Sequence, residues 1–378
     1  MTGSKAYERF TGAQVKHIYK YQPEIYFNTE RISLISSFLA TLLVGEHVPI
    51  DFGDGSGMNI LDIHKNKWNQ NILDIIAPSL REKLGEPVSS NTKIGTIASY
   101  WCRKYGFNSD CEIYAFSGDN LMSVVGLELE KPGDIGITLG TSDGVLCVTD
   151  EIRPNANEGS ILVHPQNTDN YILMLVYANG GITRGHLRDR LFENDKNWIE
   201  FNNSIKNTPV GCNGHVGFYY IENEITPNVS KSGIVKFDEN NEVIKNLSLN
   251  KSDCRSIVET QVFSYKYHSE LLGLNKISSI LVTGGGSVND EISQIIADVF
   301  EIDVMQSSIV NTAASGAALS ALYSYRKHHN IEDIQRISTI LAESKIIKAN
   351  SQNFPIYRQI YSRYGQLEAI ALNILNNN

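Results

Sequence analysis

Three apolar segments of this chain end in polar or glycine-rich turns. The first is Ile113 to Phe116, which runs into Ser117-Gly118-Asp119-Asn120. The second, residues 132–148, alternates a turn, an apolar run, a polar turn and another apolar run, which predicts a β-hairpin. In the third, residues 277–300, an apolar run meets Gly284-Gly285-Gly286 and then apolar residues at spacings of three and four. That pattern predicts a buried strand, a tight turn and an amphipathic helix.

Each turn offers groups that can bind a ligand. Asp119 and Asn120 follow a strand, and strand tips are where catalytic side chains gather, although Asp119 could instead cap a helix. Gly140 and Gly144 leave backbone N–H groups uncovered beside the hydroxyl of Thr141, which suits phosphate oxygens. An ordinary hairpin turn has the same composition for conformational reasons, so this motif is weak alone.

The triple-glycine turn permits a flat ligand or a phosphate to approach the backbone without meeting a Cβ. Asn289 or Asp290 can cap the helix that follows the turn. The glycines are consecutive, unlike those of the dinucleotide fingerprint, and no Walker A motif occurs. A further helix from Asn311 to Leu322 is built from small residues, and we expect it to pack closely and support the neighbouring site.

The alternation of strands and helices predicts an α/β protein with two domains. A chain of 378 residues exceeds the size at which single cores stop growing. We place the boundary near Asp110, with domains at 1–110 and 111–378. A strand is expected at Tyr171–Tyr177 and helices at 183–192 and 252–272. Residues 222–250 are polar and are expected to form a surface excursion without function.

Composition narrows the function classes. The net charge of -9 argues against a nucleic-acid partner. The first twenty residues lack the apolar core of a signal peptide, and serine and threonine interrupt the most apolar stretch, Ile32 to Val44. We therefore expect that stretch to be a buried helix and the protein to have no membrane partner. The sequence carries no indication of oligomeric state.

The five cysteines show no paired spacing, which favours free thiols in a reducing compartment and a cytoplasmic location. No Cys/His cluster has the spacing of zinc ligands. The nine histidines, including His328 and His329 on an expected exposed helix, show no partner arrangement for metal or nucleophilic chemistry. No metal-ligating side chain is predicted.

The collinear order of Gly118-Asp119-Asn120, Leu139-Gly140-Thr141-Ser142, Thr283-Gly284-Gly285-Gly286 and the small-residue helix resembles the FGGY carbohydrate kinases of the actin-like ATPase superfamily. Upstream segments resemble the eukaryotic xylulokinase type within that family. They are Ala6-Tyr7-Glu8-Arg9-Phe10-Thr11-Gly12, Glu30-Arg31-Ile32-Ser33-Leu34 and Asp54-Gly55-Ser56-Gly57-Met58-Asn59.

The resemblance implies a ribonuclease-H-like fold with a sugar and ATP meeting between two domains. Residues 1–110 would be the remainder of the sugar-binding domain, and 111–378 the nucleotide-binding domain. Asp119 would be the general base, and Arg9 and Asn120 would bind the sugar together with it. The ATP-binding positions implied are Gly140, Thr141, Trp198, Gly285, Gly286 and Asn289.

The chain also departs from the family pattern. The resemblance implies an early strand with an Asp-x-Gly-Thr turn for the Mg²⁺-nucleotide phosphates and a sugar-binding histidine soon after it, and neither is found. We therefore expect an incomplete first domain. The function implied is ATP- and Mg²⁺-dependent phosphorylation of D-xylulose to D-xylulose 5-phosphate. The alternatives are another FGGY sugar or polyol kinase and a catalytically impaired nucleotide-binding protein.

Overall fold

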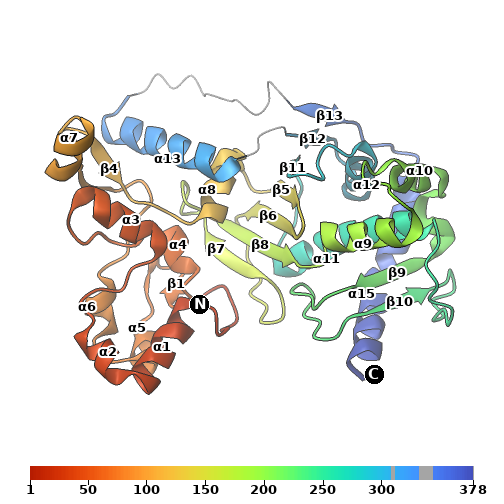
Figure 1. Ribbon diagram of the computed structural model, residues 1–378, viewed down its shortest axis with the longest axis horizontal. Coiled ribbons are helices and arrows are strands. Elements are labelled where there is room, and N and C mark those ends of the chain that lie inside the picture. The colour runs from red at the N-terminus through yellow and green to blue at the C-terminus, as the bar shows by residue number, and fades with distance from the viewer. Residues whose placement is uncertain (308–310, 332–343, 378) are drawn as a thin grey trace.

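A seven-stranded mixed sheet forms the centre of the protein (Figure 1) in a computed structural model that describes residues 1–307, 311–331 and 344–377. The strand order is β13-β12-β11-β5-β6-β8-β7. These strands are Asp134–Leu139 (β5), Asp143–Thr149 (β6), Ser160–Val163 (β7), Tyr171–Tyr177 (β8), Ser279–Thr283 (β11), Val304–Gln306 (β12) and Lys345–Ile347 (β13). β5 pairs with β6 as the predicted antiparallel hairpin and with β11 in parallel, so the two glycine turns follow adjacent parts of the sheet.

Helices bury both faces of this sheet, as β6 illustrates. Val145 and Cys147 belong to the larger apolar core, together with residues of helix Asp253–Leu272 (α11). Leu146 and Val148 belong to a second core with residues of helix Asp119–Gly126 (α8). Successive side chains of a strand point to opposite faces, so a continuous apolar run fits a strand buried on both sides.

The remaining elements of the C-terminal part surround the sheet at its β11 and β12 end and below it (Figure 1). They are Gly181–Leu191 (α9), Ile199–Asn207 (α10), Val210–Gly214 (η1), Val216–Tyr220 (β9), Gly233–Phe237 (β10), Asp290–Phe300 (α12) and Phe354–Asn377 (α15). Helix Thr312–His328 (α13) lies elsewhere, beside α8 and toward the N-terminal part. β9 and β10 form a separate antiparallel pair. The helices expected at 183–192 and 252–272 are thus confirmed.

Helices α8 and α13 lie along one another at backbone contact distance (Figure 1). A Cβ added to Gly126 would lie 1.9 Å from the carbonyl oxygen of Thr312, and one added to Gly316 would lie 1.7 Å from that of Met122. Only glycine fits at these crossing points. The prediction that small residues let this helix pack closely is confirmed.

The N-terminal part consists of short helices and two small sheets, at the red and orange end of Figure 1. Its helices are Thr11–Tyr21 (α1), Pro23–Asn28 (α2), Ile35–Val44 (α3), Phe52–Ser56 (α4), Gln70–Ile76 (α5), Leu80–Leu84 (α6) and Ser99–Tyr105 (α7). Its strands are Leu61–Asp62 (β1), Lys67–Trp68 (β2), Lys93–Thr96 (β3) and Glu112–Tyr114 (β4), of which β3 and β4 form an antiparallel pair.

A helix was predicted at residues 32–44 and is present, but the prediction that it is buried is wrong. Helix α3 exists, but only Ser37 and Ala40 are buried, while Ile35 and Phe38 are 78% and 50% exposed. The Ser37 hydroxyl hydrogen-bonds the backbone of Leu34 at the helix start. The helix therefore turns a small, locally bonded side chain inward and leaves its larger apolar residues at the surface.

The prediction that residues 222–250 form a surface excursion is also wrong in part. This segment contains β10, and its Val235 and Phe237 are buried. The buried Glu224 carboxylate accepts hydrogen bonds from the backbone N–H groups of Ala178 at 2.6 Å and Asn179 at 2.9 Å. Alternation in a short strand is hard to see when charged residues surround it.

A buried ionic triad links α11, α15 and the segment before β7. His268 lies 2.6 Å from Glu158 through Nδ1 and 3.1 Å from Glu368 through Nε2. Burial alone would lower the pKa of His268, but the hydrogen bonds and charges of the two glutamates outweigh it and raise the pKa to about 9. The imidazole is therefore charged at neutral pH.

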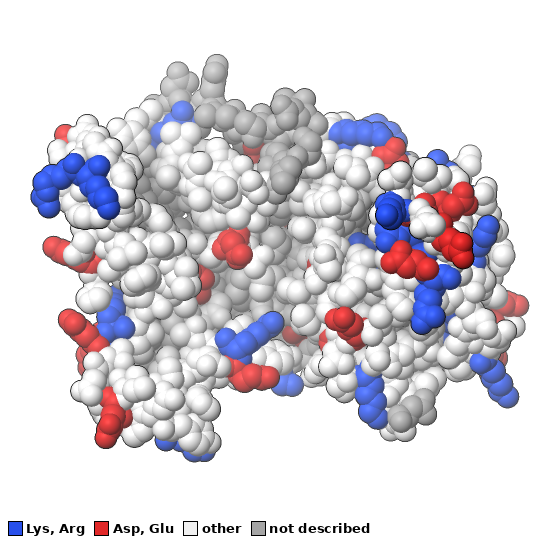
Figure 2. Space-filling view, viewed as in Figure 1, with Lys and Arg blue, Asp and Glu red and all other residues white. Residues whose placement is uncertain are grey.

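Within the described ranges, no helix is both long enough and apolar enough to cross a membrane. On the face drawn in Figure 2, acidic and basic side chains are interspersed, and many of them lie at the end that carries α9 and α10. This pattern gives the visible face no large area of a single charge sign.

Candidate active site

The tip of the β5–β6 hairpin is held in place from inside the protein. Asp143, the first residue of β6, is buried, and its Oδ1 accepts a hydrogen bond from the N–H of Gly140 at 3.1 Å. Arg184 of α9 donates to both oxygens of the same carboxylate, at 2.7 and 3.0 Å, and Tyr265 of α11 donates its hydroxyl. Thr141 remains exposed at the tip.

The start of α9 lies directly behind this tip. The N–H groups of Gly181 and Ile182 donate to the carbonyl oxygens of Gly140 and Thr141, both at 3.0 Å. A helix N-terminus carries partial positive charge. The tip therefore combines a fixed backbone, an exposed hydroxyl and a favourable electrostatic position for an anion.

The triple-glycine turn packs against the end of β5. Gly284 has a φ of +89°, and the N–H of Gly286 donates to the carbonyl oxygen of Leu139 at 2.9 Å. A Cβ on Gly285 would meet no atom of the described residues within 4 Å, so this part of the chain leaves open space beside the turn. Because β5 and β11 are adjacent and parallel, the Gly140–Thr141 tip and the Gly285–Gly286 turn lie at the same edge of the sheet.

Asn289 and Trp198 are linked through α10. Of the two caps expected for α12, Asn289 and not Asp290 is the N-cap residue, because its Oδ1 accepts from the N–H groups of Glu291 and Ile292. Its amide nitrogen also donates to Asn202, one turn beyond Trp198, at 2.7 Å. The Trp198 ring itself lies 4.3 Å below the guanidinium of Arg188. Nucleotide contact by Trp198 therefore stays a prediction.

Asp119 is the first residue of α8 and is exposed, as is Asn120. The N-cap position is Gly118, and the Asp119 carboxylate accepts a hydrogen bond from the N–H of Asn120 at 2.7 Å. The alternative that Asp119 caps the helix is therefore wrong in position, because Gly118 is the N-cap residue, and the Asp119 carboxylate is exposed to solvent. Its role as a base is untested by this geometry.

A second carboxylate, Asp54 of α4, lies beside Asp119. A Cβ on Gly118 would be 2.9 Å from Asp54 Oδ1, and Ser36 donates its hydroxyl to Asp54 Oδ2. Burial raises the pKa of Asp54, the bond from Ser36 opposes this, and the charge of Asp119 raises it further. Asp54 appeared in the sequence only as part of a motif of resemblance, and no residue spacing indicated that it would meet Asp119.

Asp51 lies behind Asp54 and is fully buried. Its carboxylate caps α4 by accepting from the N–H groups of Gly53 and Asp54, and it accepts the Ser90 hydroxyl at 2.6 Å. Burial and the charge of Asp54 raise the pKa of Asp51 to about 7. The start of α8 is therefore flanked by two carboxyl groups whose pKa values burial raises.

Arg9 does not join this group. It is exposed, and its guanidinium lies 5.8 Å from the ring of Tyr7 and 5.6 Å from that of Phe10. Among the residues that the structure describes, no ion pair or hydrogen bond connects Arg9 with Asp119 or Asn120. A sugar contact by Arg9 stays a prediction.

Family models match both parts of the chain. Residues 1–126 match the N-terminal domain of the FGGY family of carbohydrate kinases, and residues 135–325 match its C-terminal domain. The xylulose kinase of Rattus norvegicus is 37% identical over 370 residues, which are 97% of this chain and 68% of that protein. The chain belongs to the FGGY family of carbohydrate kinases.

This FGGY chain is also similar to a plant xylulose kinase. Xylulose kinase 2 of Arabidopsis thaliana is 39% identical over 335 residues, covering 86% of this chain and 60% of that protein. The chain thus spans about two thirds of the length of these relatives.

Solved structures show the fold. A xylulose kinase from Rhodospirillum rubrum has a TM-score of 0.82 at 15% identity and covers 99% of this chain and 75% of that chain. A ligand-bound xylulose kinase from Lactobacillus acidophilus has the same TM-score at 20% identity, with 100% and 75% covered. The predicted actin-like α/β fold is confirmed.

Proposed function

We propose that this chain catalyses the ATP-dependent phosphorylation of D-xylulose to D-xylulose 5-phosphate. The observation that carries this proposal is the position of two glycine turns at one edge of the sheet, in a chain whose relatives are xylulose kinases. Phosphoryl transfer requires positioning and charge stabilisation more than covalent chemistry. Two fixed turns with exposed backbone supply the positioning.

The nucleotide would be held by the glycine turns. Gly140 and Thr141 would face its phosphates, and the open space at Gly285 leaves room for it beside Gly286. Asn289 supports this side by capping α12. Mg²⁺ would accompany the phosphates and neutralise their charge during transfer. Trp198 would contribute a flat apolar surface near the same end.

Asp119 would be the general base. Its carboxylate would take the proton of the terminal hydroxyl of the sugar as that oxygen bonds to the γ-phosphorus, while the bond from this phosphorus to the bridging oxygen breaks and ADP leaves. Asn120 would bind the sugar at the same helix start, and Arg9 would reach it from the N-terminal part. Asp54 would act as a positioning residue, because it lies against Gly118 immediately before the base.

Asp119→Asn tests the base directly. This change keeps the size and the hydrogen-bond acceptor at the helix start but removes the basic carboxylate. We expect turnover to fall by roughly 10²–10⁴-fold, the usual contribution of a positioned base, with little change in ADP affinity or melting temperature. Asp74→Asn, at an exposed position on α5, is the matched control and should leave all three unchanged. Unchanged turnover in a well-folded Asp119→Asn variant would remove the residue from the mechanism.

A panel of ketoses and polyols tests the substrate. Coupled ADP release should be fastest with D-xylulose. Faster turnover with another sugar or polyol would point to a different FGGY activity. ADP binding by calorimetry without turnover on any acceptor would instead support the catalytically impaired alternative.

A further inference from the structure

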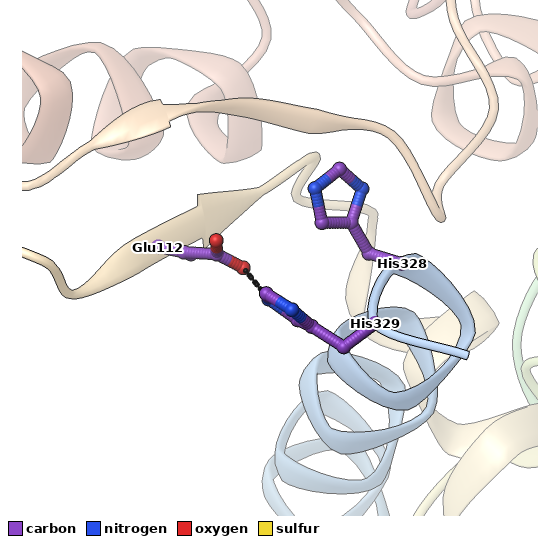
Figure 3. A group of neighbouring side chains, drawn as sticks. All are labelled: Glu112, His328 and His329. Carbon is purple, nitrogen blue, oxygen red and sulfur yellow. Dashed lines mark hydrogen bonds and ion pairs between the residues drawn. The ribbon is translucent and has the colours of Figure 1, made fainter. Parts of the chain in front are cut away.

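The end of α13 carries an arrangement that the sequence did not indicate. His328 and His329 lie beside Glu112 of β4, and one nitrogen or oxygen of each lies within 4.8 Å of the others (Figure 3). Within the described ranges, this is the one such group of three His, Cys, Asp or Glu residues. The sequence did not indicate this grouping, because β4 is more than 200 residues away from the histidines along the chain.

Glu112 is held in a fixed orientation. Lys93 donates to its Oε1 at 2.6 Å, and the hydroxyl of Tyr114 donates to its Oε2 at 2.6 Å. These bonds lower the pKa of Glu112 to about 2, so the group is a carboxylate at neutral pH. Ligating carboxylates in metal sites are commonly oriented by such second hydrogen bonds.

The histidines complete the donor set from the other side. Nε2 of His329 lies 3.1 Å from Glu112 Oε2, close to the separation of roughly 3.3 Å between two ligand atoms on a tetrahedral zinc ion. His328 is exposed and its described contacts are ring contacts, with Tyr114 at 6.2 Å and His329 at 5.1 Å between centroids. Figure 3 shows the His328 ring on the same side of the helix end as Glu112.

We propose that Glu112, His328 and His329 bind a divalent transition metal, with zinc the best fit. Two imidazoles and one carboxylate are typical zinc ligands, and solvent can fill a fourth position. The His329 N–H that now faces Glu112 would be replaced by the metal. The ammonium of Lys93 on the other carboxylate oxygen opposes a second positive charge, so the site would be weaker than a structural zinc site.

The location suggests what the metal would do. Glu112 lies in the part matched by the N-terminal family domain, whereas α13 begins in the part matched by the C-terminal domain. A metal at this position would join the end of α13 to β4. We expect zinc to stabilise the contact between these parts and to raise the melting temperature of the protein.

Calorimetric titration of the purified chain with Zn²⁺ alone tests the site, with the melting temperature followed in parallel. We expect one zinc per chain, and at least tenfold weaker binding in His328→Asn and in His329→Asn. His328→Asn is the more informative variant, because it removes no hydrogen bond to the part of the chain that the structure describes. His215→Asn is the matched control, since His215 faces a single carboxylate, Glu239, at 3.2 Å.

Cobalt as a second probe separates this site from the cysteines. Bound Co²⁺ should lack the charge-transfer absorption of thiolate ligands, which would appear if the partly exposed Cys102 or Cys111 held the metal. Zinc affinity that is unchanged in His328→Asn, a thiolate signal with cobalt, or no binding by the unmodified chain would each overturn the proposal.

Discussion

Arg184→Met is the most informative test of how the candidate phosphate turn is built. The change removes the guanidinium from its buried pair with Asp143, whose side chains are 4% and 0% exposed. Methionine keeps most of the side-chain length and volume. Asp143 would retain the N–H of Gly140 and the hydroxyl of Tyr265 as donors.

The expected loss of stability in Arg184→Met follows from the buried charge of Asp143, which the change leaves without its partner. Burial alone would lower the pKa of Arg184, but the charge and hydrogen bonds of Asp143 outweigh it and raise the pKa, so the pair is ionic. Removing one partner of a buried pair costs roughly 3–5 kcal/mol. Since Asp143 keeps two donors, we expect the lower end, about 3 kcal/mol in the free energy of unfolding.

Urea unfolding of four proteins measures this cost: the unmodified chain, Arg184→Met, Asp143→Asn and the double variant. The double variant should be more stable than the sum of the single losses implies, because the buried charge is gone. ADP affinity should fall in Arg184→Met as the Gly140 tip loses its support. Arg153→Met, in an exposed pair with Glu151, is the control and should cost less than about 1 kcal/mol. An equally small loss in Arg184→Met, or additive losses in the double variant, would refute this reasoning.

Three further predictions follow from other contacts. Gly285→Val should weaken ADP binding at least roughly tenfold, or about 1.4 kcal/mol, without changing the melting temperature, since a Cβ there meets no atom of the described residues. Unchanged ADP affinity in calorimetry would make the turn only structural. Gly316→Ala should lower the free energy of unfolding in urea by about 3 kcal/mol or more, because its Cβ meets the backbone of α8 at 1.7 Å. Gly185→Ala, whose Cβ has no described neighbour nearer than 3.9 Å, should raise it by up to about 1 kcal/mol, and equal effects of the two changes would contradict the close packing. The pKa of His268 is about 9 in the folded state, above its unfolded value, so its contribution to stability is fully present below pH of about 6.5 and is lost as pH rises through 9. Over that range the free energy of unfolding should fall on the order of 3 kcal/mol more in the unmodified chain than in His268→Gln. Parallel pH curves for the two proteins would exclude the effect.

The sequence by itself determined the strands and turns whose backbone groups form the candidate nucleotide site. The hairpin at 132–148 and the strand and glycine turn at 279–286 are local features, set by apolar alternation and by residues with special backbone freedom. The cap of the next helix was narrowed to Asn289 or Asp290, of which the structure has Asn289. The order of these motifs along the chain was also enough to indicate the family, because each motif can be recognised from a short stretch of sequence.

Tertiary structure alone decided which side chains meet. Three contacts join distant segments of the chain, so no spacing in the sequence indicates them. They place Asp54 beside Asp119, Arg184 behind the hairpin tip and Glu112 beside the two histidines. Tertiary structure also decided that Ile35 and Phe38 of α3 lie at the surface, since hydrophobicity predicts an apolar helix face but not which side of the helix the rest of the protein covers. Local patterns specify conformation, whereas packing specifies neighbours, and the electrostatics of a site depends on its neighbours.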